Sequence, residues 1–164
     1  MNLTRIMAES GDFKQANHFA RKAVHLSTDC IEPFYNLALS ELQIGKADKA
    51  AETANRMAKE FPENSDGLVL RAVAVFCAGN IVEGSELFKT LLKNYSKKVI
   101  FSQTLSLIVS IRNAGFDNWV TKLVGELKNI EGFSNIQIMA TPLSKHQFPG
   151  NSKFQNAKDV MDQR

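Results

Sequence analysis

The sequence predicts an all-α protein whose antiparallel helix hairpins stack side by side as an α-solenoid. Three observations support this fold class. Glycine recurs every 34 residues, at Gly11, Gly45 and Gly79, and this interval is the length of a helical hairpin repeat. The segments on both sides of each glycine carry apolar residues at the three- and four-residue spacing of a helix. Only four prolines and nine glycines occur in 164 residues, and Ala, Leu, Lys and Glu are common, which favours helix.

The residues around each glycine indicate how one hairpin forms. A glycine between two helical segments ends the first helix and lets the chain reverse, because it adopts backbone angles that other residues avoid. Five residues after the glycines stand small residues, Ala16, Ala50 and Gly84, which let two antiparallel helices approach closely. Positions five, nine and twelve after each glycine share one helical face. We expect that face to pack on the partner helix.

The first two predicted units differ in completeness. The first unit, about residues 1–30, has few residues before Gly11, so its first helix is short. The second unit, about residues 31–64, is the most regular. Pro33 lies in the first turn of its first helix, and Pro62 stops its second helix, because proline is tolerated at a helix start and not inside a helix.

The next two units follow the same order with increasing departure. The third unit, about residues 65–98, turns at Gly79. The fourth unit, about residues 99–131, turns at Gly115, which comes two positions later than the constant interval would place it. Two residues have therefore been added between the last two turns. These four units define a helical repeat domain over residues 1–131.

Residues 132–164 are predicted to form a polar tail, whose composition differs from that of the repeat domain. The segment contains two prolines and shows no helical period until about Lys153. A short final helix is predicted at about residues 153–162. Two alternatives stay open for this tail: it is disordered, or it packs over the open end of the solenoid.

The repeat resembles the tetratricopeptide repeat, a helix–turn–helix unit of the same period. The second unit carries most of the family's signature, at Phe34, Leu37, Ala38, Gly45, Ala50, Ala54 and Pro62. Glu41 replaces the usual aromatic residue. The resemblance extends over three to four repeats and implies a right-handed α-solenoid, whose concave face is lined by the first helix of each unit.

Composition and charge restrict the class of partner. A net charge of +3 is too small to indicate nucleic acid or an anionic membrane by itself. No apolar run is long enough to span a membrane, and the first residues do not read as a secretory signal. Cys30 and Cys77 have no zinc-like spacing, so we expect two buried thiols in a reducing compartment. The sequence therefore predicts a cytoplasmic protein.

Chemical motifs are not found in the sequence. His18 and His25 share a helix face, but no third close ligand for a metal is evident. No nucleophile, phosphate-binding or metalloprotease motif is present, so we expect no enzyme, no metal and no cofactor. The pentatricopeptide repeat, a similar hairpin, reads single-stranded RNA. The interleaved acids and bases of "KADKAAETANRMAKEFPEN" argue against that function.

The family resemblance places a partner in the concave groove. The residues that it assigns to this groove are Tyr35, Asn36, Leu39, Leu42, Val69, Val73 and Phe76. Most of them are apolar, and Asp66 would repel the acidic peptide ends that some family members bind. For Val73 and Phe76 two interpretations stay open, an exposed groove or a helix buried on both sides.

The predicted function is a non-enzymatic protein–protein interaction module. It would bind an apolar or amphipathic segment of a partner in its groove, as an adaptor or assembly factor. One alternative is a secretion-type chaperone for an apolar client. Another is a scaffolding or regulatory fragment of a longer repeat protein that self-associates, with Leu3, Ile6 and Met7 as a homodimer contact.

Overall fold

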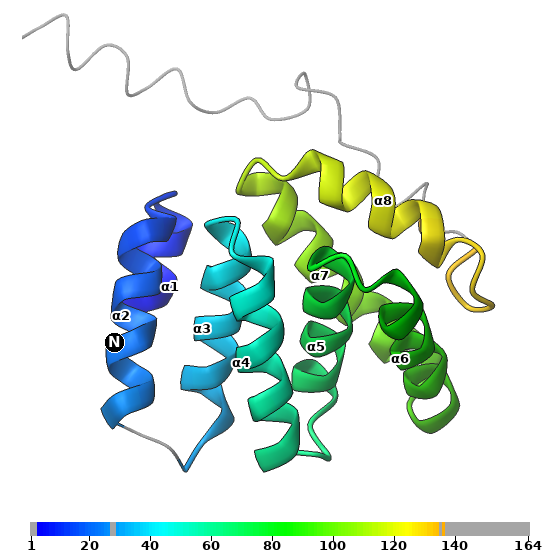
Figure 1. Ribbon diagram of the computed structural model, residues 1–164, viewed down its shortest axis with the longest axis horizontal. Helices are drawn as coiled ribbons and strands as arrows, with labels where there is room; N and C mark the ends of the chain where they lie inside the picture. Colours follow the sequence, from blue (N-terminus) through cyan, green and yellow to red (C-terminus); the bar gives the residue numbers. More distant parts are fainter. Residues whose placement is uncertain (1–2, 27–28, 135, 137–164) are drawn as a thin grey trace, which may run out of the picture.

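The computed structural model describes residues 3–26, 29–134 and 136, and within these ranges the secondary structure is helical, without strands. This confirms the all-α prediction. Each helix from α1 to α6 packs against the next one along the chain, as hairpins side by side (Figure 1). The helices are α1 (Leu3–Glu9), α2 (Phe13–Leu26), α3 (Ile31–Gln43), α4 (Ala47–Glu60), α5 (Ser65–Cys77), α6 (Ile81–Asn94), α7 (Lys97–Asn113) and α8 (Asp117–Leu127).

Glycine reverses the chain inside each hairpin, as the sequence predicts. Gly45, between α3 and α4, has a φ of 78°, in the left-handed region that other residues rarely adopt. Its N–H donates to the Leu42 carbonyl at 3.0 Å, and the next N–H, of Lys46, donates to the Glu41 carbonyl at 2.8 Å. These two bonds satisfy carbonyl groups that the end of α3 would otherwise leave without partners.

The small residue after each turn permits close helix contact. A Cβ atom added to Gly84 would lie 3.0 Å from the Cβ of Phe76 and 3.3 Å from the Ala72 carbonyl oxygen. The corresponding residues Ala16 and Ala50 are fully buried. These contacts confirm the prediction that small residues at these positions let the two helices of a hairpin approach closely.

A buried polar network joins α2, α3 and α4, and the sequence did not indicate it. The side chain of Glu41 is only 4% exposed and pairs with Arg21, whose Nη2 lies 3.1 Å from Oε1. The Thr53 hydroxyl donates to Oε2 at 2.8 Å. Nearby, the Asn17 amide donates to the Ser40 hydroxyl at 3.0 Å. Burial raises the pKa of Glu41, while the Thr53 hydrogen bond and the Arg21 charge oppose that rise.

α7 does not continue the regular stack. It packs against α5 and also reaches α3, and it passes behind α5 in the view of Figure 1. The Gln103 amide donates to the Ser65 hydroxyl at 3.0 Å, at the start of α5. The Gln43 amide, at the end of α3, donates to the Ser110 hydroxyl at 2.9 Å. α7 therefore crosses obliquely from the start of α5 to the end of α3.

The core continues a few residues past the predicted domain end at 131. Phe133 is fully buried and meets Phe88 of α6 edge-on, with ring centroids 5.5 Å apart. Ile136 is fully buried as well. The short helix predicted at 153–162 lies outside the described residues. None of the described helices combines the length and apolar character that crossing a membrane requires.

Candidate functional site

The structure buries most of the residues that the sequence assigned to a concave groove. Because α7 lies across α5 and reaches α3, these side chains belong to the core and cannot meet a partner in this conformation. The sequence left two interpretations open for Val73 and Phe76, and the structure shows that both belong to a helix buried on both sides. The four core residues are Leu42, Val69, Val73 and Phe76.

The other three groove residues, Tyr35, Asn36 and Leu39, are half-buried. Tyr35 lines a pocket of about 350 Å³ together with Asp66 in the first turn of α5. Burial, and after it the Asp66 charge, raises the pKa of Tyr35 to about 12. Asn36 faces a different pocket, and Leu39 packs against the core.

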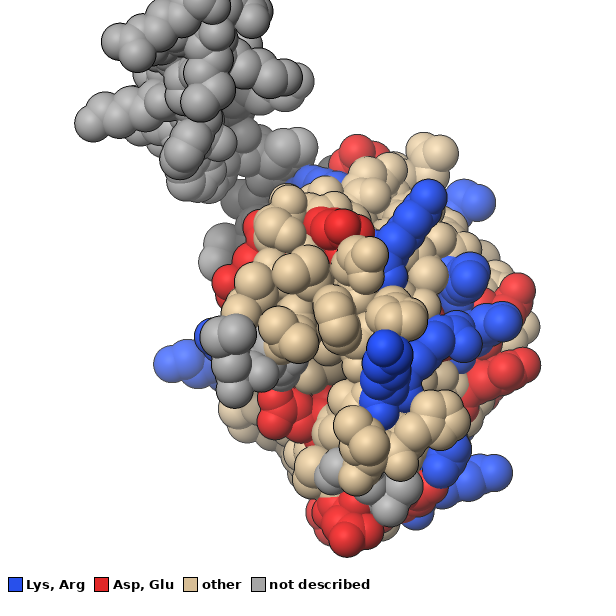
Figure 2. Space-filling view, turned by 90° about the vertical axis from the view of Figure 1, so that its left-hand side faces the viewer, with Lys and Arg blue, Asp and Glu red and all other residues tan. Residues whose placement is uncertain are grey.

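A larger pocket of about 660 Å³ opens between α1, α2 and α3. We name it the N-terminal pocket. Figure 2 faces this edge of the molecule, where uncharged residues cover the middle and Lys and Arg gather toward one side. The pocket is lined by Leu3, Thr4, Phe19, Lys22, Ala23, Leu26, Cys30, Glu32, Pro33 and Asn36.

The shortness of α1 opens the N-terminal pocket. α1 has 7 residues, whereas α3 and α5 have 13 each. α1 therefore covers only the part of α2 that is nearest to their turn. Leu26, near the far end of α2, is 87% exposed, and Leu3 is 41% exposed. Exposed apolar side chains around a pocket are typical of binding surfaces.

Sequence reasoning identified part of this edge. It predicted a short first helix and pointed to Leu3 as a contact. It passed over Phe19 and Leu26, and it assigned Ala23 to the face that packs on the partner helix. A signal for Leu26 was present, because the matching position one repeat later, in the second unit, is Glu60. The next unit has the polar Asn94 there, so an exposed apolar residue at this position indicates a surface with another use.

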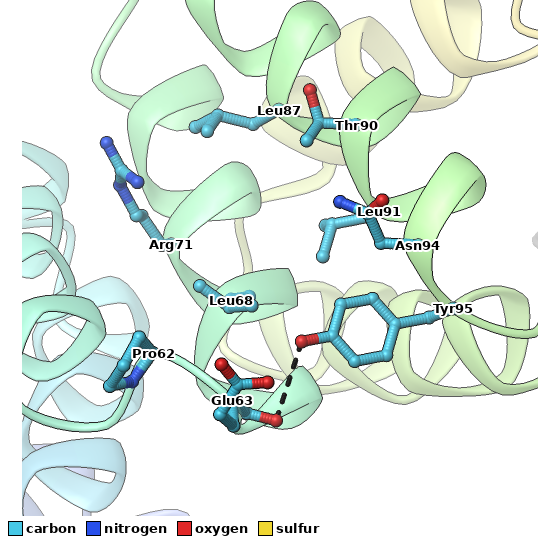
Figure 3. A pocket seen from close by; sticks show the side chains of 9 residues that line it. All are labelled: Pro62, Glu63, Leu68, Arg71, Leu87, Thr90, Leu91, Asn94 and Tyr95. Carbon is cyan, nitrogen blue, oxygen red and sulfur yellow. Dashed lines mark hydrogen bonds between the residues drawn. The ribbon is translucent and has the colours of Figure 1, made fainter.

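A second pocket, of about 390 Å³, lies between α5 and α6 (Figure 3). Leu68, Leu87 and Leu91 supply its apolar wall. Three of its polar side chains, Arg71, Thr90 and Tyr95, are bonded within the chain. The Arg71 Nε donates to the Asn55 side chain at 2.6 Å, and the Figure 3 view shows its guanidinium pointing away from the pocket centre.

The two cysteines differ in environment. Cys30 is exposed at the rim of the N-terminal pocket, so the expectation that both thiols are buried is wrong for it. Cys77 is half-buried, and burial raises the pKa of its thiol to about 12. In the described ranges, no three His, Cys, Asp or Glu side chains gather closely enough to hold a metal ion.

Comparison of the sequence with protein-family models finds no match, and comparison with curated proteins finds none either.

Proposed function

We propose that this chain is a non-enzymatic protein-binding module, a tetratricopeptide-like right-handed α-solenoid that holds its partner in the N-terminal pocket. The observation that carries the proposal is the open, largely apolar pocket at the α1–α2–α3 edge, next to the 87% exposed Leu26. The concave side is a weaker candidate, because α7 occupies it. The proposal thus keeps the predicted class of function and moves the site.

The chemistry of the pocket favours a protein over a small polar ligand. Apolar side chains from all three helices contribute to the lining, Leu3 from α1, Phe19 from α2 and Pro33 from α3. Lys22 and Glu32 contribute one charge of each sign. An apolar centre with a charged rim is the usual arrangement of a protein–protein contact.

Site-specific photo-crosslinking tests this proposal. A photoreactive phenylalanine analogue is placed at Leu26, and a matched variant carries it at Val82, which is 80% exposed on α6. Both proteins, each with all 164 residues, are irradiated in lysate of their source cells. We expect position 26 to capture a defined protein that position 82 does not. Equal capture at both positions, or capture at 82 alone, would place the function elsewhere on the molecule.

A further inference from the structure

The repeat register identifies what the N-terminal pocket replaces. A shift of one repeat relates Ala23 to Met57 and Pro33 to Gly67. The space between Met57 and Gly67 is filled by Ile31, the first residue of α3: a Cβ atom added to Gly67 would lie 3.1 Å from Ile31 Cδ1 and 3.2 Å from Met57 Cε. Ala23 and Pro33 both line the N-terminal pocket. The pocket therefore corresponds to the space that the start of α3 fills.

A second residue of α3 completes the comparison. Phe34 is three positions after Ile31, on the same helix face, and is 1% exposed. The guanidinium carbon of Arg56 lies 4.9 Å from the centroid of the Phe34 ring, a cation–π contact. The position that matches Arg56 in the first hairpin is Lys22, which lines the pocket. The cation is present in both hairpins.

Among the described residues, the apolar pair itself has no counterpart in the first hairpin. α1 begins at Leu3, and the position that matches Leu3 in α3 is Leu37. The turns of α3 from Ile31 to Asn36 thus have no equivalent among the described residues. As a result Met57 is fully buried, whereas its match Ala23 is only half-buried.

Resting on the proposed function, we propose that the N-terminal pocket binds one amphipathic helix of a partner protein. The partner helix lies parallel to α3 and antiparallel to α2. It places an aliphatic side chain against Ala23 and Pro33, as Ile31 lies against Met57 and Gly67. Three residues later it places an aromatic ring beside the Lys22 ammonium group. This is recognition of a helix in a groove, with the aromatic residue as its anchor.

A partner protein fits the pocket better than a second copy of this chain. Ile31 and Phe34 lie at the α3 positions that the occupant would match, but they are engaged in their own hairpin. Leu3 and Ile6 have the same spacing and are exposed, yet both are aliphatic and give Lys22 no ring. The cation at position 22 therefore points to an aromatic residue from another protein.

The probe is a labelled, end-capped peptide with the sequence of α3, Ile31–Gln43, which carries the required pair at its natural spacing. Two control peptides replace Phe34 with leucine or with serine. Binding to the 164-residue protein is measured by fluorescence anisotropy. We expect the parent peptide to bind, the leucine peptide to bind more weakly, and the serine peptide to lose at least about tenfold in affinity.

Protein variants locate the peptide. Leu26→Asp should weaken binding at least about tenfold, whereas Val82→Asp, at a similarly exposed apolar residue on α6, should leave it unchanged. Lys22→Met should weaken the parent peptide roughly two- to fivefold and leave the leucine peptide unchanged, because only an aromatic ring gains from the cation.

Three results would overturn the inference. The first is no binding of the parent peptide at about 1 mM protein, or binding that Leu26→Asp leaves intact. The second is an equal effect of Lys22→Met on the parent and leucine peptides. The third is self-association in sedimentation that Leu26→Asp abolishes, since that would make a second copy the occupant. A protein crosslinked at position 26 would still support the proposed function in the first two cases.

Discussion

Replacing Glu41 tests whether the buried network between α2, α3 and α4 stabilises the fold. Glu41→Ala removes the bond from Thr53, worth about 1.5 kcal/mol for a charged acceptor. It also removes one buried methylene group, at about 0.8 kcal/mol. The Arg21 pair adds well under 1 kcal/mol, because the Arg21 side chain is 44% exposed and water screens it.

Relief of the buried charge offsets part of this loss. We therefore expect Glu41→Ala to lower the free energy of unfolding by about 2 kcal/mol in urea at neutral pH, and the Tm by about 6 °C. Glu41→Gln keeps the size of the side chain and can still accept from Thr53, so we expect a change of less than about 1 kcal/mol. A loss below about 0.5 kcal/mol for the alanine variant would refute a stabilising network.

The same residue makes a signed pH prediction. Because burial raises the pKa of Glu41 in the folded state, its contribution to stability is fully present below the unfolded pKa of about 4.3 and is lost as pH rises through the folded pKa. The stability of the wild type relative to Glu41→Gln should therefore increase as pH falls from about 8 to about 4.5. A relative stability that falls over this range would show that Arg21 and Thr53 dominate over burial.

Two further predictions test the hairpin contacts and the thiols. Gly84→Ala should cost about 1–3 kcal/mol of unfolding free energy, because its methyl group would lie 3.0 Å from Phe76, whereas Gly125→Ala, with nothing within 4 Å, should not destabilise. Equal costs would show that the helices separate easily. In the native protein at about pH 8, iodoacetamide should modify Cys30 well before Cys77, and urea should remove the difference; equal native rates would mean that Cys77 is accessible.

The hairpins could be predicted from the sequence because local rules determine them. The backbone geometry of Gly45 and Gly79 alone ends the helix that precedes each of them. The small residue five positions later is needed wherever two helices lie close, which the contact between Gly84 and Phe76 shows. Both signals act between near neighbours in the chain, so one sequence is enough to read them.

The position of α7 could not be predicted in the same way. Its apolar face has the same period whether it continues the stack or crosses α3 and α5. The contact between Gln43 and Ser110 joins residues 67 positions apart, and no local pattern specifies it. The apolar run from Gly67 to Gly79 did indicate a helix buried on two sides. That composition, more than the family resemblance, pointed to the correct placement of Val73 and Phe76.

The two ends of the described helical array differ in how their apolar surface is covered, and this difference favours the N-terminal edge as the binding site. Near the far end Phe133 and Ile136 fold over the last hairpins and are fully buried. At the near end Leu3 and Leu26 remain exposed around a pocket that the second hairpin fills with the start of α3. A stacked array leaves the apolar face of its last unit exposed unless something covers it. The partner helix that we propose would provide this cover.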